Sequence, residues 1–171
     1  MGMTELSFCC IADRIPRDAT AVVIAYSGGV DSQVLLHLCA MQSELHSKLS
    51  AIYIHHGLQA EADVWGEHCR AQCTVLEVAF QLIKVDASPK QGLSPEQAAR
   101  EARYAALKTA LPEGGVLLLA QHREDQMETL LLQLFRGAGV DGLAAMPEQV
   151  AFGRGRLIRP LLQIGKQAIV D

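Results

Sequence analysis

A short polar loop carries the clearest chemical signal in this sequence. It follows an apolar, β-branched run at residues 21–26 and consists of Ser27, Gly28, Gly29, Val30, Asp31 and Ser32. Glycines let a backbone approach a ligand closely, and backbone N–H groups at a helix N-terminus form a concavity suited to phosphate. The loop lacks the Lys-Ser or Lys-Thr pair of a Walker A loop and the GxGxxG pattern of a dinucleotide loop. A divalent cation between carboxylate and phosphate explains Asp31 in such a place, and the alternative is a tight turn with a helix cap.

Acidic side chains gather around position 125. Asp125 and Glu128 are three residues apart on a predicted helix, so both project from one face. Glu124 and Glu128 are four apart and repel each other unless a cation or a dipole compensates. The helix dipole alone explains Glu124 and Asp125 in the first turn, but it explains Glu128 poorly because that residue lies in the second turn.

Basic and imidazole side chains complete the candidates. Arg100 and Arg103 are three apart on another predicted helix, which would direct both at one phosphate-bearing ligand, unless Arg100 pairs with Glu96 at the surface. His55 and His56 lie at the end of a predicted strand. Each could contact a ligand or could make a hydrogen bond that stabilises the loop, and the sequence leaves both roles open. The last part of the chain is locally basic. Its basic side chains could contact nucleic-acid phosphates or could simply form a solvated face, and they are Arg154, Arg156, Arg159 and Lys166.

The elements that position these side chains alternate between strand and helix. Apolar runs predict five strands, at 21–26, 49–54, 80–85, 114–120 and 157–160, and helical periodicity predicts helices at 34–45, 60–78, 94–111 and 123–136. The third helix starts at Ser94 as N-cap, with Pro95 next and Gln97 placed for a capping box. Residues 137–155 are loop-like. The alternation predicts an α/β fold, a doubly wound, mostly parallel five-stranded sheet with helices on both faces and ligands beyond the carboxyl ends of its strands.

Composition bounds the possible functions. The chain has 171 residues, half of them apolar, which suits one domain with a sizeable core and excludes general disorder. A formal charge of −4 gives no global field for a polyanion, which argues weakly against a free-standing nucleic-acid binder. No apolar run is long enough to cross a bilayer. Five cysteines without a CxxC pair indicate neither disulfides nor zinc, and we expect reduced thiols in a soluble, cytoplasmic protein.

The loop at 27–32 resembles the pyrophosphate-binding loop (PP-loop) of the ATP pyrophosphatases, whose fold is adenine nucleotide alpha hydrolase-like. Further motifs narrow the resemblance: residues 55–58 (HHGL), 99–104 (AREARY), 121–129 (QHREDQMET), 136–143 (RGAGVDGL) and 159–162 (RPLL). In this order and spacing they resemble the N-terminal catalytic domain of the tRNA(Ile)-lysidine synthetases, from about Val22 onward. We therefore expect one catalytic ATP-pyrophosphatase domain over residues 1–171, truncated at its C-terminal end because Asp171 stops in mid-element.

The resemblance implies an activity and a set of partners. The reaction joins L-lysine to the wobble cytidine of an isoleucine tRNA through an adenylated cytidine, with ATP and Mg²⁺ as cofactors and AMP and pyrophosphate as products. The implied catalytic residues are Asp31, Arg100, Arg103, Asp125 and Glu128, and Asp31 and Asp125 also hold the metal. The implied nucleotide-binding residues are Ser27, Gly28, Gly29, Val30, Asp31, Ser32, His55, His56 and His122. The sequence departs from the family in Glu124, where Asp is usual, and in Gln121, where His is frequent.

Other classes stay open as alternatives. A tRNA thiolase, another ATP pyrophosphatase, needs a sulfur-carrying cysteine or paired CxxC motifs, which the sequence does not show. A glutamine-dependent amidating ligase needs a glutaminase domain, for which the chain has no room. A nucleotide-binding module of the universal-stress type has no reason to combine Asp125, Glu128 and the motif at 136–143.

Overall fold

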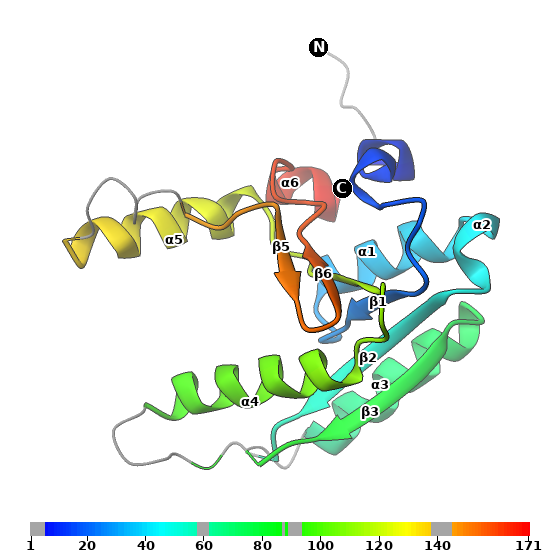
Figure 1. Cartoon of the computed structure of the whole chain (residues 1–171), viewed down its shortest axis with the longest axis horizontal. Coiled ribbons are helices and arrows are strands. Elements are labelled where there is room, and N and C mark those ends of the chain that lie inside the picture. The colour runs from blue at the N-terminus through cyan, green and yellow to red at the C-terminus, as the bar shows by residue number, and fades with distance from the viewer. Residues whose placement is uncertain (1–5, 58–61, 87, 89–93, 138–144) are drawn as a thin grey trace.

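The computed structural model describes residues 6–57, 62–86, 88, 94–137 and 145–171. Its centre is a six-stranded sheet in the order β3-β2-β1-β4-β6-β5 (Figure 1). The strands are β1 (Val22–Ala25), β2 (Leu49–His55), β3 (Ala79–Lys84), β4 (Val116–Leu118), β5 (Gln149–Phe152) and β6 (Gly155–Ile158). All neighbouring strands run parallel except β5, which pairs antiparallel with β6. The predicted fold class, a mostly parallel α/β sheet, is confirmed.

The prediction of five strands is wrong by one. Strand β5 lies in the segment predicted to be a loop, and it forms a hairpin with β6 in which Gln149 is opposite Ile158. The run is only four residues long and is exposed at alternate positions, so it lacks the continuous apolar character of the central strands. Gly153 in the turn has a φ of +59°, which a glycine adopts without strain. The glycines around β5 thus belong to a tight hairpin turn.

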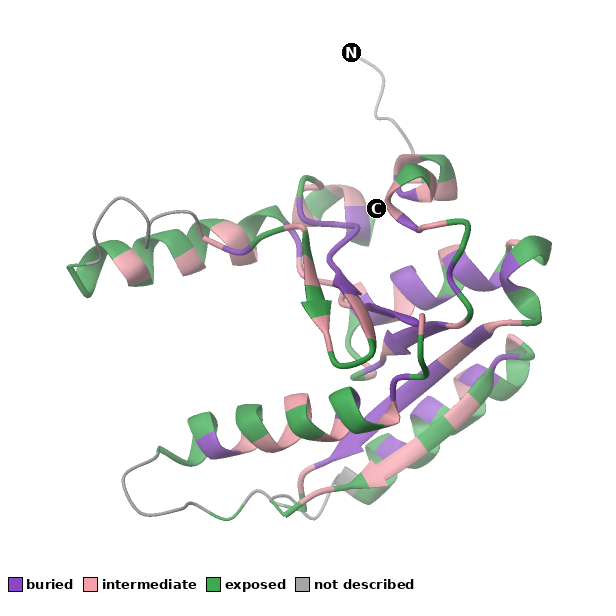
Figure 2. Ribbon diagram, in the orientation of Figure 1, coloured by how far each residue is buried: buried purple, intermediate pink, exposed green. Residues whose placement is uncertain are grey.

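Helices cover both faces of the sheet. One face packs against α1 (Val30–Ala40), α3 (Ala62–Val75) and α6 (Lys166–Val170), together with two short 3₁₀ turns at Phe8–Cys10 and Ala12–Arg14. The opposite face packs against α4 (Pro95–Ala110) through Leu107, which lies among Leu117, Leu157 and Ile52. Figure 2 shows the central strands buried between these layers. A short helix, α2 (Ser43–His46), connects α1 to β2.

Helix α4 begins where the sequence predicts. The Ser94 hydroxyl accepts a hydrogen bond from the Gln97 N–H at 3.2 Å, as an N-cap does. The second half of the predicted capping box is absent, because the Gln97 side chain donates to Glu101 Oε1 at 3.2 Å instead. Glu101 lies one turn further along the helix, and this contact draws the amide away from the backbone of Ser94.

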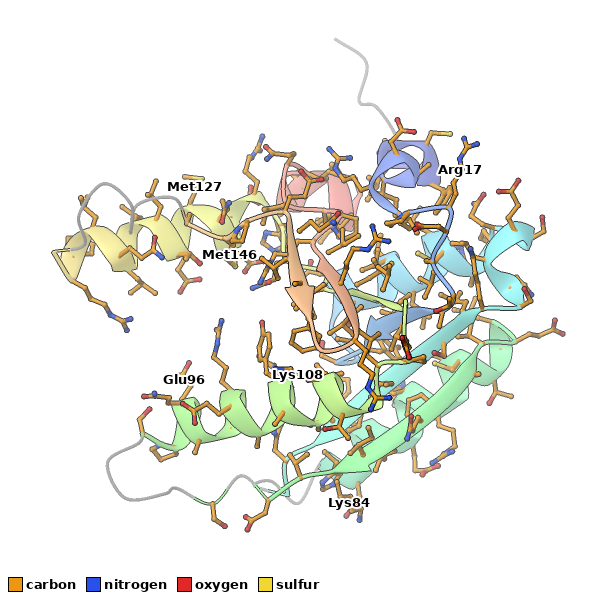
Figure 3. All side chains as sticks on the ribbon, in the orientation of Figure 1. Arg17, Lys84, Glu96, Lys108, Met127 and Met146 are labelled. Carbon is orange, nitrogen blue, oxygen red and sulfur yellow. The ribbon has the colours of Figure 1, made fainter. Side chains whose placement is uncertain are left out.

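Helix α5 (Arg123–Phe135) extends away from the sheet (Figure 1). Its predicted helical character is confirmed, but the apolar side chains that gave the periodicity are exposed, as Figure 2 shows. Met127 illustrates this, since it is 57% exposed and lies on α5 away from the sheet (Figure 3). Near the start of α5, the Gln126 side chain makes two hydrogen bonds, of 2.7 and 2.8 Å, to the backbone of Met146. No helix among the described residues is long and apolar enough to span a membrane.

The strand order fixes where a ligand binds. From the central strand β1, the chain proceeds to β2 and β3 on one side and later to β4 and β6 on the other. Strand order reverses between β1 and β4, and in such sheets a ligand crevice lies at the carboxyl edge next to this point. Most of the predicted site residues lie at or after the ends of β1, β2 and β4, or in the first turns of α5, on this edge, whereas Arg100 and Arg103 lie within α4.

Candidate functional site

The loop after β1 is held in shape by its own serines. The Ser32 hydroxyl accepts from the Ser27 N–H at 3.3 Å, donates to the Gly29 carbonyl at 2.9 Å and lies 3.1 Å from the Ser27 hydroxyl. Gly28 has a φ of +80°, and a Cβ there would lie 2.9 Å from Cys69 Sγ. Glycine is therefore required at 28 for conformation and for space. The loop leads directly into α1, whose N-cap is Gly29.

A cleft of about 310 Å³ opens at the carboxyl ends of β1, β2 and β4. Its aliphatic walls include Ile52, Leu107 and Leu119. The predicted site residues that line it are Ser27, Gly29, Asp31, Ser32, His56, Arg103 and Asp125. Four separate segments of the sequence thus meet at one cavity, whose lining combines aliphatic side chains with two carboxylates and a guanidinium.

His122 is the centre of an acidic group beside the cleft. Its ring is 7% exposed, with Nε2 3.7 Å from Asp31 Oδ2 and Nδ1 3.2 Å from Glu124 Oε2. On the same side, Nδ1 lies 3.6 Å from Asp125 Oδ2. The imidazole therefore lies between Asp31, the acid of the first loop, and Glu124 and Asp125, the two acids of α5.

Asp125 has a structural contact as well as a place in the cleft. Its Oδ2 accepts the backbone N–H of His122 at 2.8 Å, which satisfies one of the free donors at the start of α5. A carboxylate in the first turn also interacts favourably with the helix dipole. Asp125 therefore caps the start of α5, and this contact does not exclude a second role, because the side chain also lines the cleft.

Lys166 is a functional candidate that the sequence did not single out. Its ammonium forms an ion pair with Asp31 Oδ1, across 135 positions of sequence. The backbone N–H of Lys166 donates to Glu124 Oε2 at 2.8 Å, and this hydrogen bond holds the pKa of the Glu124 carboxyl below its usual value. This hydrogen bond therefore holds the start of α6 against the start of α5, beside the loop at 27–32.

A basic and aromatic wall faces the acids from α4. The guanidinium carbons of Arg100 and Arg103 lie 5.3 and 5.8 Å from the centre of the Tyr104 ring, within the range of cation–π attraction. Arg103 and Tyr104 line the cleft, whereas Arg100 is exposed and does not. The sequence predicts that this helix directs both arginines at one phosphate-bearing ligand. Both contact Tyr104, but only Arg103 lines the cleft, and the shared ligand stays a prediction.

Arg159 is buried at the carboxyl end of β6. Its Nε donates to Gln121 Oε1 at 2.6 Å, and its second donor reaches the Pro147 carbonyl at 2.8 Å. Burial lowers the pKa of this guanidinium, while hydrogen bonding to Tyr104 acts in the opposite direction. Because Gln121 and Tyr104 both line the cleft, Arg159 positions two of its walls.

The predicted basic surface near the C-terminus is not one surface. Arg156 pairs with Asp18 at 3.1 Å, Lys166 with Asp31, and Arg159 is buried. These three side chains therefore have separate partners, and their closeness in sequence does not become a common face.

The two histidines after β2 differ in position. His56 lines the cleft, and burial together with the nearby Arg103 lowers the pKa of its imidazole, which favours the neutral form. His55 does not line the cleft. Its Nδ1 accepts the Gly57 N–H at 3.1 Å, and its Nε2 lies 3.2 Å from Asp63 on α3. His55 therefore makes the hydrogen bond within the loop. For His56, which lines the cleft, a ligand contact stays a prediction.

Three other predicted residues lie apart from the cleft lining. Gly28 and Val30 border a separate hollow on the α3 side of the loop, next to His68. Glu128 is exposed on α5 and makes no hydrogen bond or ion pair with any residue that the structure describes. The motif at 136–143 falls almost entirely outside the described residues, which include only Arg136 and Gly137 of it. The roles predicted for these residues stay predictions.

Comparison with protein families decides which family this architecture represents. The model of a family described as "PP-loop domain" matches residues 7–171, nearly the whole chain. The chain belongs to the PP-loop domain family. The resemblance drawn from the loop at 27–32 is thereby confirmed.

Curated relatives of this PP-loop domain carry one name. The tRNA(Ile)-lysidine synthase of Pseudomonas syringae pv. tomato is 56% identical over 152 residues, which are 88% of this chain and 34% of that protein. The protein of the same name from Methylococcus capsulatus is 50% identical over 148 residues, 86% of this chain and 34% of its own length. The chain thus spans about a third of the length of the relatives that it matches.

Solved structures share the fold at low identity. The U34-tRNA thiolase NcsA from Methanococcus maripaludis superposes with a TM-score of 0.71 at 17% identity, over 95% of this chain and 60% of that one. The NH3-dependent NAD synthetase from Campylobacter jejuni gives a TM-score of 0.56 at 17% identity, over 95% of this chain and 66% of that one. These likenesses show the fold of the PP-loop domain alone.

The donor groups of the PP-loop domain fit a magnesium ion held together with a phosphate ligand. Among the described residues, no cluster of three or more His, Cys, Asp or Glu side chains has the arrangement of a complete metal site. Magnesium, however, is commonly bound by one or two carboxylates plus phosphate oxygens and water. Asp31 and Asp125 supply two carboxylates at the cleft, which is the number that such an arrangement requires.

The cysteines of the PP-loop domain lie away from the cleft. Cys39, Cys69 and Cys73 are buried in the core, and burial raises the pKa of Cys69 and of Cys73 to about 11. A thiol with such a pKa is protonated at neutral pH and is a poor nucleophile. Cys9 and Cys10 lie in the first 3₁₀ turn. The three buried cysteines are therefore packing residues of the core.

Proposed function

We propose that this PP-loop domain is the catalytic part of a tRNA(Ile)-lysidine synthase. The reaction would transfer AMP from ATP to the carbonyl oxygen of the wobble cytidine of an isoleucine tRNA, and L-lysine would then displace AMP to form lysidine. The observation that carries the proposal is the cleft itself. It joins the loop at 27–32 with Asp31, Asp125 and Arg103 in a chain 50–56% identical to curated proteins of that name.

ATP fits the cleft in one orientation. Its phosphates would lie at the loop after β1, where backbone N–H groups and the N-terminus of α1 favour negative charge. The aliphatic surface of Ile52, Leu107 and Leu119 would take the base. The uncharged state favoured for His56 suits a contact with the sugar or base more than one with the phosphates.

Asp31 and Asp125 would hold Mg²⁺ together with the phosphates. The bound ion would offset negative charge on the phosphates and on the pyrophosphate leaving group. Arg103 lies in the cleft wall, where its guanidinium would stabilise charge that develops on the α-phosphate. Arg100, on the outer side of Tyr104, would meet the approaching tRNA backbone, since it is exposed and has no carboxylate partner among the described residues.

The second step needs an uncharged amine. The side-chain amine of lysine is protonated at neutral pH, so a nearby base must orient it and accept its proton before attack. We assign Glu128 to this role because it lies one turn beyond Asp125 on α5, and its carboxylate has no partner among the described residues. His122, enclosed by three acids, would keep the carboxylates of Asp31 and Asp125 in place.

A tRNA substrate also places the protein in the cytoplasm, and we propose that residues 1–171 act there as one domain. The proposal is tested by incubating the chain with ATP, Mg²⁺, L-lysine and an isoleucine tRNA transcript, and by measuring pyrophosphate and lysidine. Lysidine should require both lysine and tRNA, whereas pyrophosphate should require tRNA, because the first step releases it before lysine acts. The matched control is the same transcript with uridine in place of the wobble cytidine, which should give neither product. If pyrophosphate is released only when a sulfur donor is added, and no lysidine forms, the result would favour a thiolase instead.

A further inference from the structure

The ion pair between Lys166 and Asp31 places a cation directly over the anion-binding loop. Asp31 is the second residue of α1, and Lys166 is the first residue of α6. The approach is fixed by the backbone, because the Lys166 N–H donates to Glu124 at 2.8 Å and the Arg123 N–H donates to the Ile164 carbonyl at 3.0 Å. The lysine side chain can therefore move while its point of attachment stays in place.

The two oxygens of Asp31 have different neighbours. Oδ1 pairs with the Lys166 ammonium, and Oδ2 lies 3.7 Å from the His122 ring. A carboxylate without a partner at this position would repel the phosphates of a nucleotide. The ammonium therefore neutralises Asp31 at the point where a triphosphate has to enter.

This ion pair is a poor candidate for a purely structural contact. The side chains of Lys166 and Asp31 are 42% and 29% exposed, and ion pairs with such exposure contribute little to the stability of a fold. Helix α6 already has an apolar anchor in Ile169, which is 4% exposed within the core on this face of the sheet. The pair is therefore not needed to dock α6.

We infer that Lys166 is a phosphate-binding residue that exchanges Asp31 for the nucleotide. In the resting protein, the ammonium covers the carboxylate. When ATP and Mg²⁺ bind, Asp31 turns to the cation and the ammonium turns to a phosphate oxygen. Lysine suits such an exchange because its ammonium is a point charge on a flexible four-carbon stem, whereas the guanidinium of arginine favours a fixed bidentate pair. The inference rests on the proposed binding of ATP in the cleft.

The exchange has a distinct signature in nucleotide affinity. Without a divalent cation, Lys166 alone offsets the charge of Asp31, so its removal adds repulsion to the loss of a phosphate contact. With Mg²⁺ present, the cation covers Asp31, and only the phosphate contact is lost. Loss of the lysine should therefore weaken ATP binding more in the absence of Mg²⁺ than in its presence.

The test is isothermal titration of the chain with a non-hydrolysable ATP analogue, once in EDTA and once in saturating Mg²⁺. Lys166→Met, which keeps the length of the stem, should raise the Kd at least tenfold in EDTA. In Mg²⁺ the factor by which it raises the Kd should be several times smaller. Lys166→Arg, which keeps the charge, should stay within about threefold of the wild type in EDTA. Thermal midpoints of all variants verify that they are folded.

Lys84→Met is the matched control. Lys84 also pairs with an aspartate, Asp63 at 3.4 Å, but it lies on the edge strand β3, far from α6 (Figure 3). Its replacement should leave the Kd of the ATP analogue unchanged, both in EDTA and in Mg²⁺. A loss for Lys166→Met that is no larger in EDTA than in Mg²⁺, or unchanged affinity in both, overturns the exchange. Absence of binding by the wild-type chain would instead overturn the proposed nucleotide site itself, and with it the role of Lys166.

Discussion

Replacing Arg159 with methionine should destabilise the fold more than replacing any exposed arginine. The guanidinium is 7% exposed and donates to Gln121 at 2.6 Å and to the Pro147 carbonyl at 2.8 Å. Hydrogen bonds from a charged donor contribute about 1.5–3 kcal/mol each. Part of this gain is offset, because methionine does not require a charge to be buried. The expected net loss is about 3 kcal/mol.

The corresponding change in melting temperature follows from the size of the chain. Unfolding entropy near the midpoint is about 2.1 cal/mol/K per residue, which gives about 0.36 kcal/mol/K for 171 residues. The loss of about 3 kcal/mol therefore lowers the Tm by about 8 °C. Circular dichroism melts and urea titrations of the same samples measure the two quantities independently.

Arg154→Met is the control for this experiment. Arg154 is exposed in the turn of the same hairpin, and its substitution should move the Tm by less than about 2 °C, as surface substitutions do. If Arg159→Met changed the Tm as little as Arg154→Met, then Gln121, Pro147 and Tyr104 would not depend on the guanidinium. The assignment of Arg159 as a positioning residue of the cleft would then be wrong.

Three further predictions use other contacts. Gly155→Ala would place a Cβ 2.0 Å from the Gly115 carbonyl oxygen, so strands β4 and β6 must separate, and urea titration should show a loss of at least about 2 kcal/mol. Burial lowers the pKa of His56 from 6.5 in the folded protein, so below pH 6.5 the unfolded chain binds more protons at this residue than the folded one. The free energy of unfolding should therefore fall as the pH drops below 6.5, and it should fall less steeply in His56→Asn. Because its arginines do not form one surface and its net charge is −4, the chain should bind tRNA weakly in filter assays at about 150 mM salt, and tight selective capture would contradict this.

The parts of the site that the sequence predicted are those that depend on short stretches of chain. The loop at 27–32 needs only its own glycines and serines and the strand before it, and its internal hydrogen bonds join Ser27, Gly29 and Ser32. The alternation of strands and helices then places His56 and Asp125 at the same edge, because parallel strands present their carboxyl ends together. Local chemistry and one topological rule were sufficient for these residues.

Other features depend on neighbours that are distant in sequence. The apolar run of strand β5 is only three residues long, Val150 to Phe152, and the strand forms because β6 supplies its hydrogen-bonding partner. Helix α5 has the apolar periodicity of a packed helix, yet Leu131 and Leu134 are 49% and 55% exposed. Periodicity predicts that a helix forms and which of its faces is apolar, but it does not predict that another element covers that face.

Arg156 and Arg159 show why one positioning residue of the cleft depends on the exact end of a strand. In the sequence both belong to one basic stretch. In the structure, Arg156 lies within β6 and reaches Asp18 at the surface, whereas Arg159 directly follows the last residue of β6, Ile158. Residues that follow parallel strands at their carboxyl ends face the ligand crevice. The predicted strand at 157–160 contains Arg159, so this rule does not select it from the sequence. The observed end of β6 at Ile158 separates the buried arginine that positions Gln121 and Tyr104 from Arg156, which reaches the surface.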